Sequence, residues 1–253
     1  RNSPESLPFL IEHARNANNP QTAIAALNAV RKLATEANVP DLLQIIQFSE
    51  SSDVRGDAKR VIMSLAERSS SRSEIAVSIK NAYDNATNDA AKGIFLELLG
   101  AAGGDTAAGI VKETLESEDK KMRIAALAAL GTWADDSQFD TLLDYMADEE
   151  DDALRRSAFA QAFQFLTKDR KREALALEDM WTGLATEART ENEKIQIVNG
   201  LANIVEDWAF AVVEHFLEDE IDKVSYRAEK ALDHMEGKRD RLKPNRNEEK
   251  EDE

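Results

Sequence analysis

The stretch Met122–Trp133, "MRIAALAALGTW", places apolar side chains at positions i, i+3, i+4 and i+7, which is the spacing of one face of an α-helix. Residues 23–33, "AIAALNAVRKL", and residues 154–166, "LRRSAFAQAFQFL", have the same spacing. Few segments of the chain alternate between apolar and polar residues with a period of two, as half-buried strands do. The pattern therefore predicts an all-α fold.

The helical pattern repeats along the chain at a spacing of 30 to 40 residues. Seven anchor positions near the starts of similar helices define the repeat: Thr22, Val54, Ala90, Met122, Leu154, Lys194 and Val224. Four residues after each anchor stands a small or β-branched residue: Ala26, Ala58, Ile94, Ala126, Ala158, Val198 and Ala228. Apolar pairs precede most anchors by twelve and eleven residues, as Leu42 and Leu43 precede Val54. Each unit is thus expected to be a first helix, a short polar turn and a second helix, which must stack on its neighbours to bury its apolar faces.

Three of the second helices carry a more specific motif: "DVRGDAKRVI" (53–62), "KMRIAALAALG" (121–131) and "ALRRSAFAQAF" (153–163). These segments resemble the HEAT repeat and the related HEAT-like repeats of phycobilin lyases, and the resemblance extends over residues 4 to 236. Arg55, Arg123 and Arg155 occupy the arginine position of the family. The other units depart from it at Ala23, Ala91, Ile195 and Ser225. The resemblance implies a right-handed α-α superhelix (α-solenoid) of about seven helical hairpins with a discontinuous arginine ladder.

The repeat register predicts where the units and the end of the repeat domain lie. The seven units are expected at approximately residues 4–36, 39–68, 73–101, 105–134, 136–167, 175–205 and 207–236. Residues 237–253 lack the apolar pattern, so we expect Gly237 to end the last helix and a charged disordered tail or linker to follow. The basic run Lys168–Arg172 is interpreted as a solvated loop between units. Residues 190–204 and 209–219 are also similar to HEAT-type segments of large extracytoplasmic bacterial proteins, which favours that compartment slightly and leaves the localisation open.

The net charge of −17 is unevenly distributed. Residues 1–100 contain 11 Lys and Arg against 12 Asp and Glu, whereas residues 101–253 contain 21 against 37. An acidic field of this kind repels phosphate backbones, so we expect no nucleic-acid partner and favour a basic protein or peptide. No run of about 18 apolar residues is present, which argues against membrane insertion. The chain has no cysteine, which excludes disulfides and thiolate chemistry.

No catalytic or cofactor motif is recognisable in the sequence. His13, His215 and His234 are not spaced as zinc ligands. The glycines of "GAAGGD", residues 100–105, lack the Lys-Ser/Thr of a phosphate-binding loop and are read as a turn. Trp133, Trp181 and Trp208 are interpreted as packing residues, because acidic residues neighbour two of them and disfavour duplex binding. We therefore expect no enzymatic activity, no cofactor and no structural metal.

The candidate functional residues are acids in the turns that precede second helices. The strongest cluster is "DEEDD", residues 148–152, and two other turns carry similar clusters. The predicted docking edge comprises Glu116, Glu118, Asp119, Asp148, Glu149, Glu150, Asp151, Asp152, Glu218, Asp219, Glu220 and Asp222. One or two acids per turn are explained as helix N-caps, and the remainder predicts a docking surface for a basic partner.

Other functions remain open beside this non-catalytic scaffold. "DEEDDALRRSAF" lacks the Gly and final Glu of an EF-hand loop, so only weak binding of a divalent cation is expected at the acidic turns. The alternatives are a HEAT-like accessory module of a larger bacterial enzyme and, less favoured, a lyase-like enzyme of the HEAT-like class.

Overall fold

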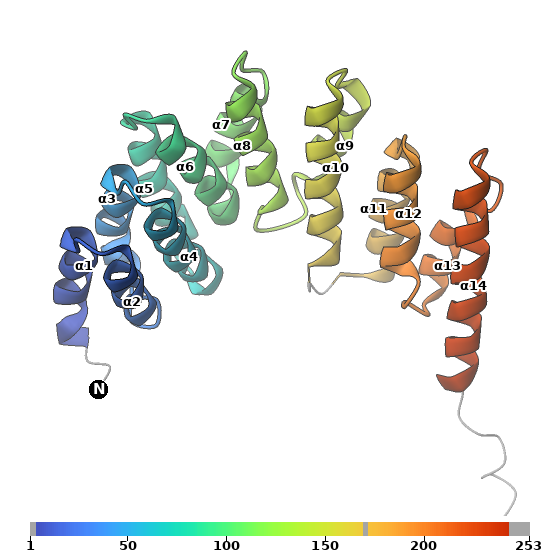
Figure 1. Cartoon of the computed structure of the whole chain (residues 1–253), viewed down its shortest axis with the longest axis horizontal. Coiled ribbons are helices and arrows are strands. Elements are labelled where there is room, and N and C mark those ends of the chain that lie inside the picture. The colour runs from blue at the N-terminus through green and yellow to red at the C-terminus, as the bar shows by residue number, and fades with distance from the viewer. Residues whose placement is uncertain (1–3, 169–171, 243–253) are drawn as a thin grey trace, which may run out of the picture. The chain divides into compact units, whose positions relative to one another are not determined.

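The computed structural model of the chain describes residues 4–168 and 172–242, and every regular element in these residues is helical (Figure 1). This confirms the all-α prediction and the α-solenoid class. The helices divide into two compact units, which are described separately. Unit 1 comprises Arg1–Leu142 and Asp151–Gln161, and unit 2 comprises Leu143–Glu150 and Ala162–Glu253.

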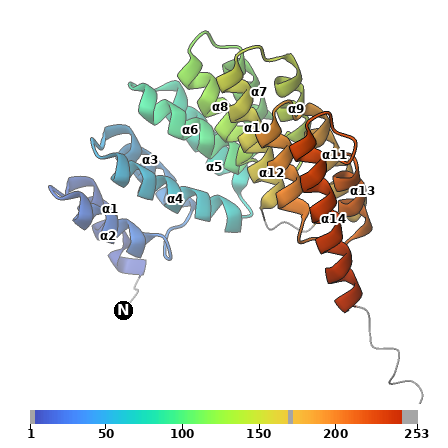
Figure 2. The ribbon, with the colours of Figure 1, turned by 45° about the vertical axis from the view of Figure 1, so that its right-hand side comes forward.

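Unit 1 is a stack of helical hairpins arranged in two layers. Its complete helices are α1 (Leu7–Asn16), α2 (Pro20–Val30), α3 (Val39–Phe48), α4 (Ser52–Arg68), α5 (Arg72–Asp84), α6 (Asp89–Ala102), α7 (Asp105–Leu115) and α8 (Lys120–Gly131), with short 3-10 helices at Pro4–Ser6 and Glu36–Asn38. The odd-numbered helices contact one another in one layer, and the even-numbered helices contact one another in the second layer (Figure 2). Each hairpin thereby covers the apolar faces of its neighbours.

Unit 2 repeats the arrangement with α11 (Ala174–Glu187), α12 (Glu191–Leu201), α13 (Asp207–Glu214) and α14 (Asp222–Leu242). Helix α11 packs against α13, and α12 packs against α14. Two helices are divided between the units, namely α9 (Phe139–Asp148) and α10 (Asp152–Thr167).

Polar side chains define the starts of the second helices. The Asn88 side chain accepts a hydrogen bond from Ala91 N at 2.8 Å before α6, and the Asp119 side chain accepts one from Lys121 N at 2.8 Å before α8. Thr190 and Glu193 form a reciprocal capping box at α12. Such caps satisfy backbone N–H groups that have no partner within the helix, so the polar turns determine where each second helix begins.

Small residues allow the second helices to approach closely, as the repeat pattern predicts. Ala126 and Ala129 of α8 are fully buried. Gly100 of α6 lies against α8 so closely that a Cβ atom there would come within 2.1 Å of the Ala129 carbonyl oxygen. Gly103 and Gly104 have φ angles of 73° and 90° in the turn after α6, a conformation that other residues rarely adopt. The sequence "GAAGGD" is therefore a helix end and a turn.

The end of the last helix differs from the sequence prediction. Helix α14 does not stop before Gly237 but continues to Leu242, so the expectation that Gly237 ends this helix is wrong. Two tertiary contacts hold the extra turn: Lys238 Nζ donates to Asn203 O at 2.6 Å, and the Arg239 guanidinium lies 4.3 Å from the centre of the Phe210 ring. Residues 243–253 of the expected tail, and residues 169–171 of the basic loop, lie outside the described residues.

Candidate functional site

The turn before α8 contains the first group of predicted docking acids. Glu116 follows the last residue of α7, Asp119 caps α8, and Glu118 lies between them. All three side chains are exposed. Only Asp119 is required to start the helix, because its Oδ1 accepts the Lys121 N–H. Capping of α8 therefore does not require Glu116 or Glu118.

The turn before α10 contains "DEEDD", and Asp151 of this cluster caps the helix. Asp151 Oδ1 accepts hydrogen bonds from Ala153 N at 2.9 Å and Leu154 N at 3.1 Å, which caps α10. Lys120 Nζ, from the start of α8, lies 2.7 Å from Asp151 Oδ2. This hydrogen bond is the main reason that the pKa of Asp151 falls from 3.8 to about 2, and the bond from Leu154 N contributes further.

The other four acids of the cluster lie on either side of Asp151 in the sequence. Asp148 is the last residue of α9 and Asp152 is the first residue of α10. Asp148, Glu150 and Asp152 are exposed, whereas Glu149 is half-buried. The cluster thus combines one capping residue with three carboxylates in contact with solvent.

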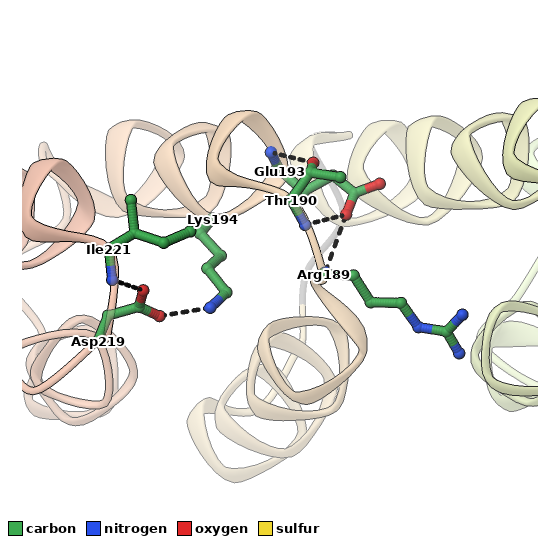
Figure 3. Close-up of polar contacts among 6 residues, drawn as sticks. All are labelled: Arg189, Thr190, Glu193, Lys194, Asp219 and Ile221. Atoms are coloured by element: carbon green, nitrogen blue, oxygen red, sulfur yellow. Dashed lines mark hydrogen bonds and ion pairs between the residues drawn. The ribbon is translucent and has the colours of Figure 1, made fainter.

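In unit 2, the turn before α12 is built on a buried carboxylate. Glu193 is only 3% exposed. Its Oε2 accepts hydrogen bonds from Arg189 N at 3.0 Å and Thr190 N at 3.1 Å, and Thr190 Oγ1 accepts one from Glu193 N at 3.3 Å (Figure 3). These bonds make Glu193 a structural residue of the turn.

The next turn is joined to this one by two lysine–carboxylate pairs. Lys194 Nζ lies 2.5 Å from Asp219 Oδ2, and Asp219 Oδ1 accepts a hydrogen bond from Ile221 N at 3.0 Å (Figure 3). Lys223 at the start of α14 pairs with Glu191 at the start of α12. Burial acts to raise the pKa of Asp219, but the bonds from Lys194 and Ile221 N outweigh it and lower this pKa. Glu218, Glu220 and Asp222 remain exposed.

The structure therefore brings predicted acids together within each unit. In unit 1, the Lys120–Asp151 pair joins the turn at Glu116–Asp119 to the start of α10. In unit 2, the pairs of Lys194 and Lys223 join the turns before α12 and α14. A single docking edge that runs through both units stays a prediction. Sequence reasoning missed these lysines because it counted charge by segment, although each stands within the first four residues of a second helix.

The repeat arginines are partly or fully buried. Arg155 is 3% exposed, and Arg55 and Arg123 are half-buried. Arg55 Nη1 donates to Ser49 O at 2.6 Å, beyond the last residue of α3. Arg189 acts similarly, because its Nη2 donates to Ala147 O at 2.7 Å near the end of α9. A cation at this position satisfies carbonyl groups and opposes the helix dipole.

One cavity of unit 1 is lined in part by carboxylates. This cavity, about 580 Å³ in volume, lies beside Tyr83 and Thr114. The carboxylates that line it, Asp84 and Glu113, are both exposed. Within residues 4–168 and 172–242, no group of three or more His, Asp or Glu side chains is placed to hold a metal ion.

The three tryptophans lie in the interior. Trp133, Trp181 and Trp208 are at most 6% exposed, which confirms their interpretation as packing residues. The described helices include none that is long and apolar enough to cross a membrane.

Comparison with known proteins supports the repeat assignment. Residues 78–164 match the model for HEAT repeats. Human deoxyhypusine hydroxylase in complex with glycerol is similar in structure, with 14% sequence identity, a TM-score of 0.44, and coverage of 92% of this chain and 97% of that chain. An engineered protein has 16% identity and a TM-score of 0.37, with coverage of 91% of this chain and 68% of that chain. No curated protein sequence matches the chain.

Proposed function

We propose that this chain, a HEAT-like helical repeat protein, is a non-catalytic scaffold that binds a basic protein or peptide through its acidic turns. The observation that carries the proposal is the surplus of exposed carboxylates in these turns. After capping and the lysine pairs are accounted for, Glu118, Glu150 and Glu220 remain exposed. Helix capping alone does not explain them, because a cap needs one acceptor.

The form of the surface supports binding over catalysis. General acid–base catalysis needs a carboxylate whose pKa is shifted by burial within a cleft. Glu193 is deeply buried, but its Oε2 is occupied by two backbone N–H groups of the capping turn. The acids that remain accessible lie on turns, where they can contact an extended cationic segment.

The proposal is tested with a fluorescent peptide of alternating lysine and serine and the full chain, by fluorescence polarisation at low and high salt. We expect binding that weakens about tenfold or more as salt rises, because exposed charges are screened. The triple variant Glu118→Gln/Glu150→Gln/Glu220→Gln should weaken binding at low salt.

The matched control is Glu12→Gln/Glu50→Gln/Glu67→Gln, which removes three exposed carboxylates from the N-terminal part of unit 1. It changes the net charge equally and should retain most of the affinity. Equal losses in the two triple variants would show that only net charge matters. Affinity that does not respond to salt would refute the electrostatic mechanism.

A further inference from the structure

Helix α14 carries a stripe of basic side chains within the acidic C-terminal part of the chain. The basic stripe consists of Lys223, Arg227, Lys230, His234, Lys238 and Arg241. At 3.6 residues per turn these positions fall within about 80° of the helix circumference. Val224, Ala228, Ala231 and Met235 form the buried face of α14 beside this stripe. The helix thus presents cations along one border of its packing face.

The middle of the basic stripe faces a cavity between α12 and α14. The cavity has a volume of about 470 Å³. Its lining comprises Asn199, Ala202, Asn203, Arg227, Lys230, Ala231 and His234. This lining combines cationic and neutral side chains and includes no carboxylate, in contrast to the turns at the ends of the same helices. Figures 1 and 2 show α12 and α14 side by side.

Neutral groups of α12 and of the turn after it contact the basic side chains at this cavity. Asn199 Oδ1 accepts a hydrogen bond from Arg227 Nε at 2.7 Å, and Asn203 Oδ1 lies 3.4 Å from His234 Nε2. Lys238 Nζ donates to Asn203 O. An amide oxygen orients the Arg227 guanidinium without cancelling its charge. Lys230 differs, because Asp233 and Glu229 lie 3.0 Å and 3.5 Å from its Nζ and offset its charge.

Arg227 has the geometry to bind a carboxylate. Its Nε is used by Asn199, and among the described residues the guanidinium forms no ion pair. The two Nη atoms can therefore donate to both oxygens of one carboxylate, an arrangement that is stronger and more directional than a single contact.

We propose that the groove between α12 and α14 binds an acidic segment of a partner protein. Arg227 holds a carboxylate at the centre of the groove, and Lys230 and His234 contact acids one or two turns further along α14. The amide groups of Asn199 and Asn203 suit the peptide backbone, because each carries both donors and an acceptor. From Arg227 to Lys238 the helix rises about 16 Å, which matches about five residues of extended chain.

A short acidic peptide fits this surface better than a nucleic acid. The basic stripe is narrow, and the chain around it has a net charge of −17. A long polyanion would meet the exposed acids of the neighbouring turns, whereas a segment of about five residues stays within the groove. The inference is independent of the proposed basic partner, since the two surfaces have opposite charge.

The test uses the full chain and a twelve-residue fluorescein-labelled peptide of alternating glutamate and serine, with binding followed by fluorescence polarisation at low salt. We expect Arg227→Glu/Lys230→Glu to weaken binding about tenfold or more, because both substitutions place a negative charge against the peptide. Arg227→Lys should weaken binding less, because lysine keeps the positive charge. Some affinity should still be lost, because lysine lacks the paired N–H donors of arginine. Circular dichroism checks that each variant is folded.

The control is Lys32→Glu/Lys112→Glu, which changes two exposed lysines of unit 1 and alters the net charge by the same amount. It should retain most of the affinity. Absence of peptide binding by the natural chain, or equal weakening in both double variants, would overturn the proposed site. Tighter binding of a single-stranded oligonucleotide of equal charge would show that the proposed partner class is wrong.

Discussion

Two joints between neighbouring hairpins, one in each unit, are built differently. In unit 1, α6 and α8 meet through Gly100 and the backbone of Ala129, with no room for a Cβ atom. In unit 2, the turns before α12 and α14 are joined by the Lys194–Asp219 pair beside the capping carboxylate of Glu193. The first joint depends on close packing of two helices, and the second depends on hydrogen bonds and an ion pair. The two joints should therefore respond to different substitutions.

The largest expected effect is at the α6–α8 joint. Gly100→Ala should lower the free energy of unfolding by about 3 kcal/mol, which is at the upper end of the usual cost of adding atoms to a well-packed core. The obstructing atom is a backbone oxygen, so no change of rotamer can relieve the clash, and the helices must separate. Urea unfolding measures the loss.

Gly109→Ala is the matched control, because Gly109 lies within α7 and an added Cβ meets no atom within 4 Å. There the same substitution should leave the free energy of unfolding unchanged or raise it by up to about 1 kcal/mol, since alanine favours the helix. Equal effects at the two glycines would mean that the α6–α8 approach is looser than the structure shows.

The apolar period was sufficient to predict the class of fold. Leu127 and Leu130 of "MRIAALAALGTW" are buried as that period requires, because a helix can bury a stripe only if its spacing is 3.6 residues. Sequence rules for helix ends were less successful where the end of a helix depends on contacts from another hairpin. Gly237 resembled a helix end, yet Lys238 and Arg239 are held by residues about 30 positions earlier.

The charge pattern was predicted only in part for the same reason. Counting acids by segment identified the turns, and Glu118, Glu150 and Glu220 are exposed. It could not show that Lys120 and Lys194 lie against carboxylates 31 and 25 residues away. It also concealed the basic stripe, because α14 carries acids and cations on different faces that cancel in a sum.

An intermediate effect is expected at the polar joint of unit 2. Glu193→Ala should lower the free energy of unfolding by about 2 kcal/mol, because it removes a buried carboxylate and leaves the N–H groups of Arg189 and Thr190 without their acceptor. Glu193→Gln should lower the free energy of unfolding by less, since the amide oxygen of glutamine can still accept these hydrogen bonds. Chemical unfolding of the full chain measures both.

Asp179→Ala is the control for this substitution, since it removes an exposed carboxylate from α11 of the same unit. It should change the free energy of unfolding by less than about 0.5 kcal/mol. If Glu193→Ala were equally harmless, the capping box would not stabilise the turn, and the contrast between the two joints would disappear.

The smallest effect is expected at Asp151, where a cap and an ion pair are combined at the surface. The folded-state pKa of about 2 lies below the ordinary 3.8, so the ionised carboxylate stabilises the fold. This contribution is complete above pH 4 and is lost as the pH falls through 2. Asp151→Asn cannot ionise, so its stability deficit relative to the natural chain should shrink as the pH falls from 5 to 2.5.

Urea titrations at several pH values measure this difference, with Asp152→Asn as the control at the adjacent exposed residue. The Asp152 variant should show a small deficit that changes little with pH, because no backbone N–H or lysine of the described structure is bonded to its carboxylate. A constant deficit for Asp151→Asn would mean that its side chain acts as a neutral cap. The ion pair between Lys120 and Asp151 would then contribute no stability, and the charge of Asp151 would be as available to a docking partner as the charges of the other acids of "DEEDD".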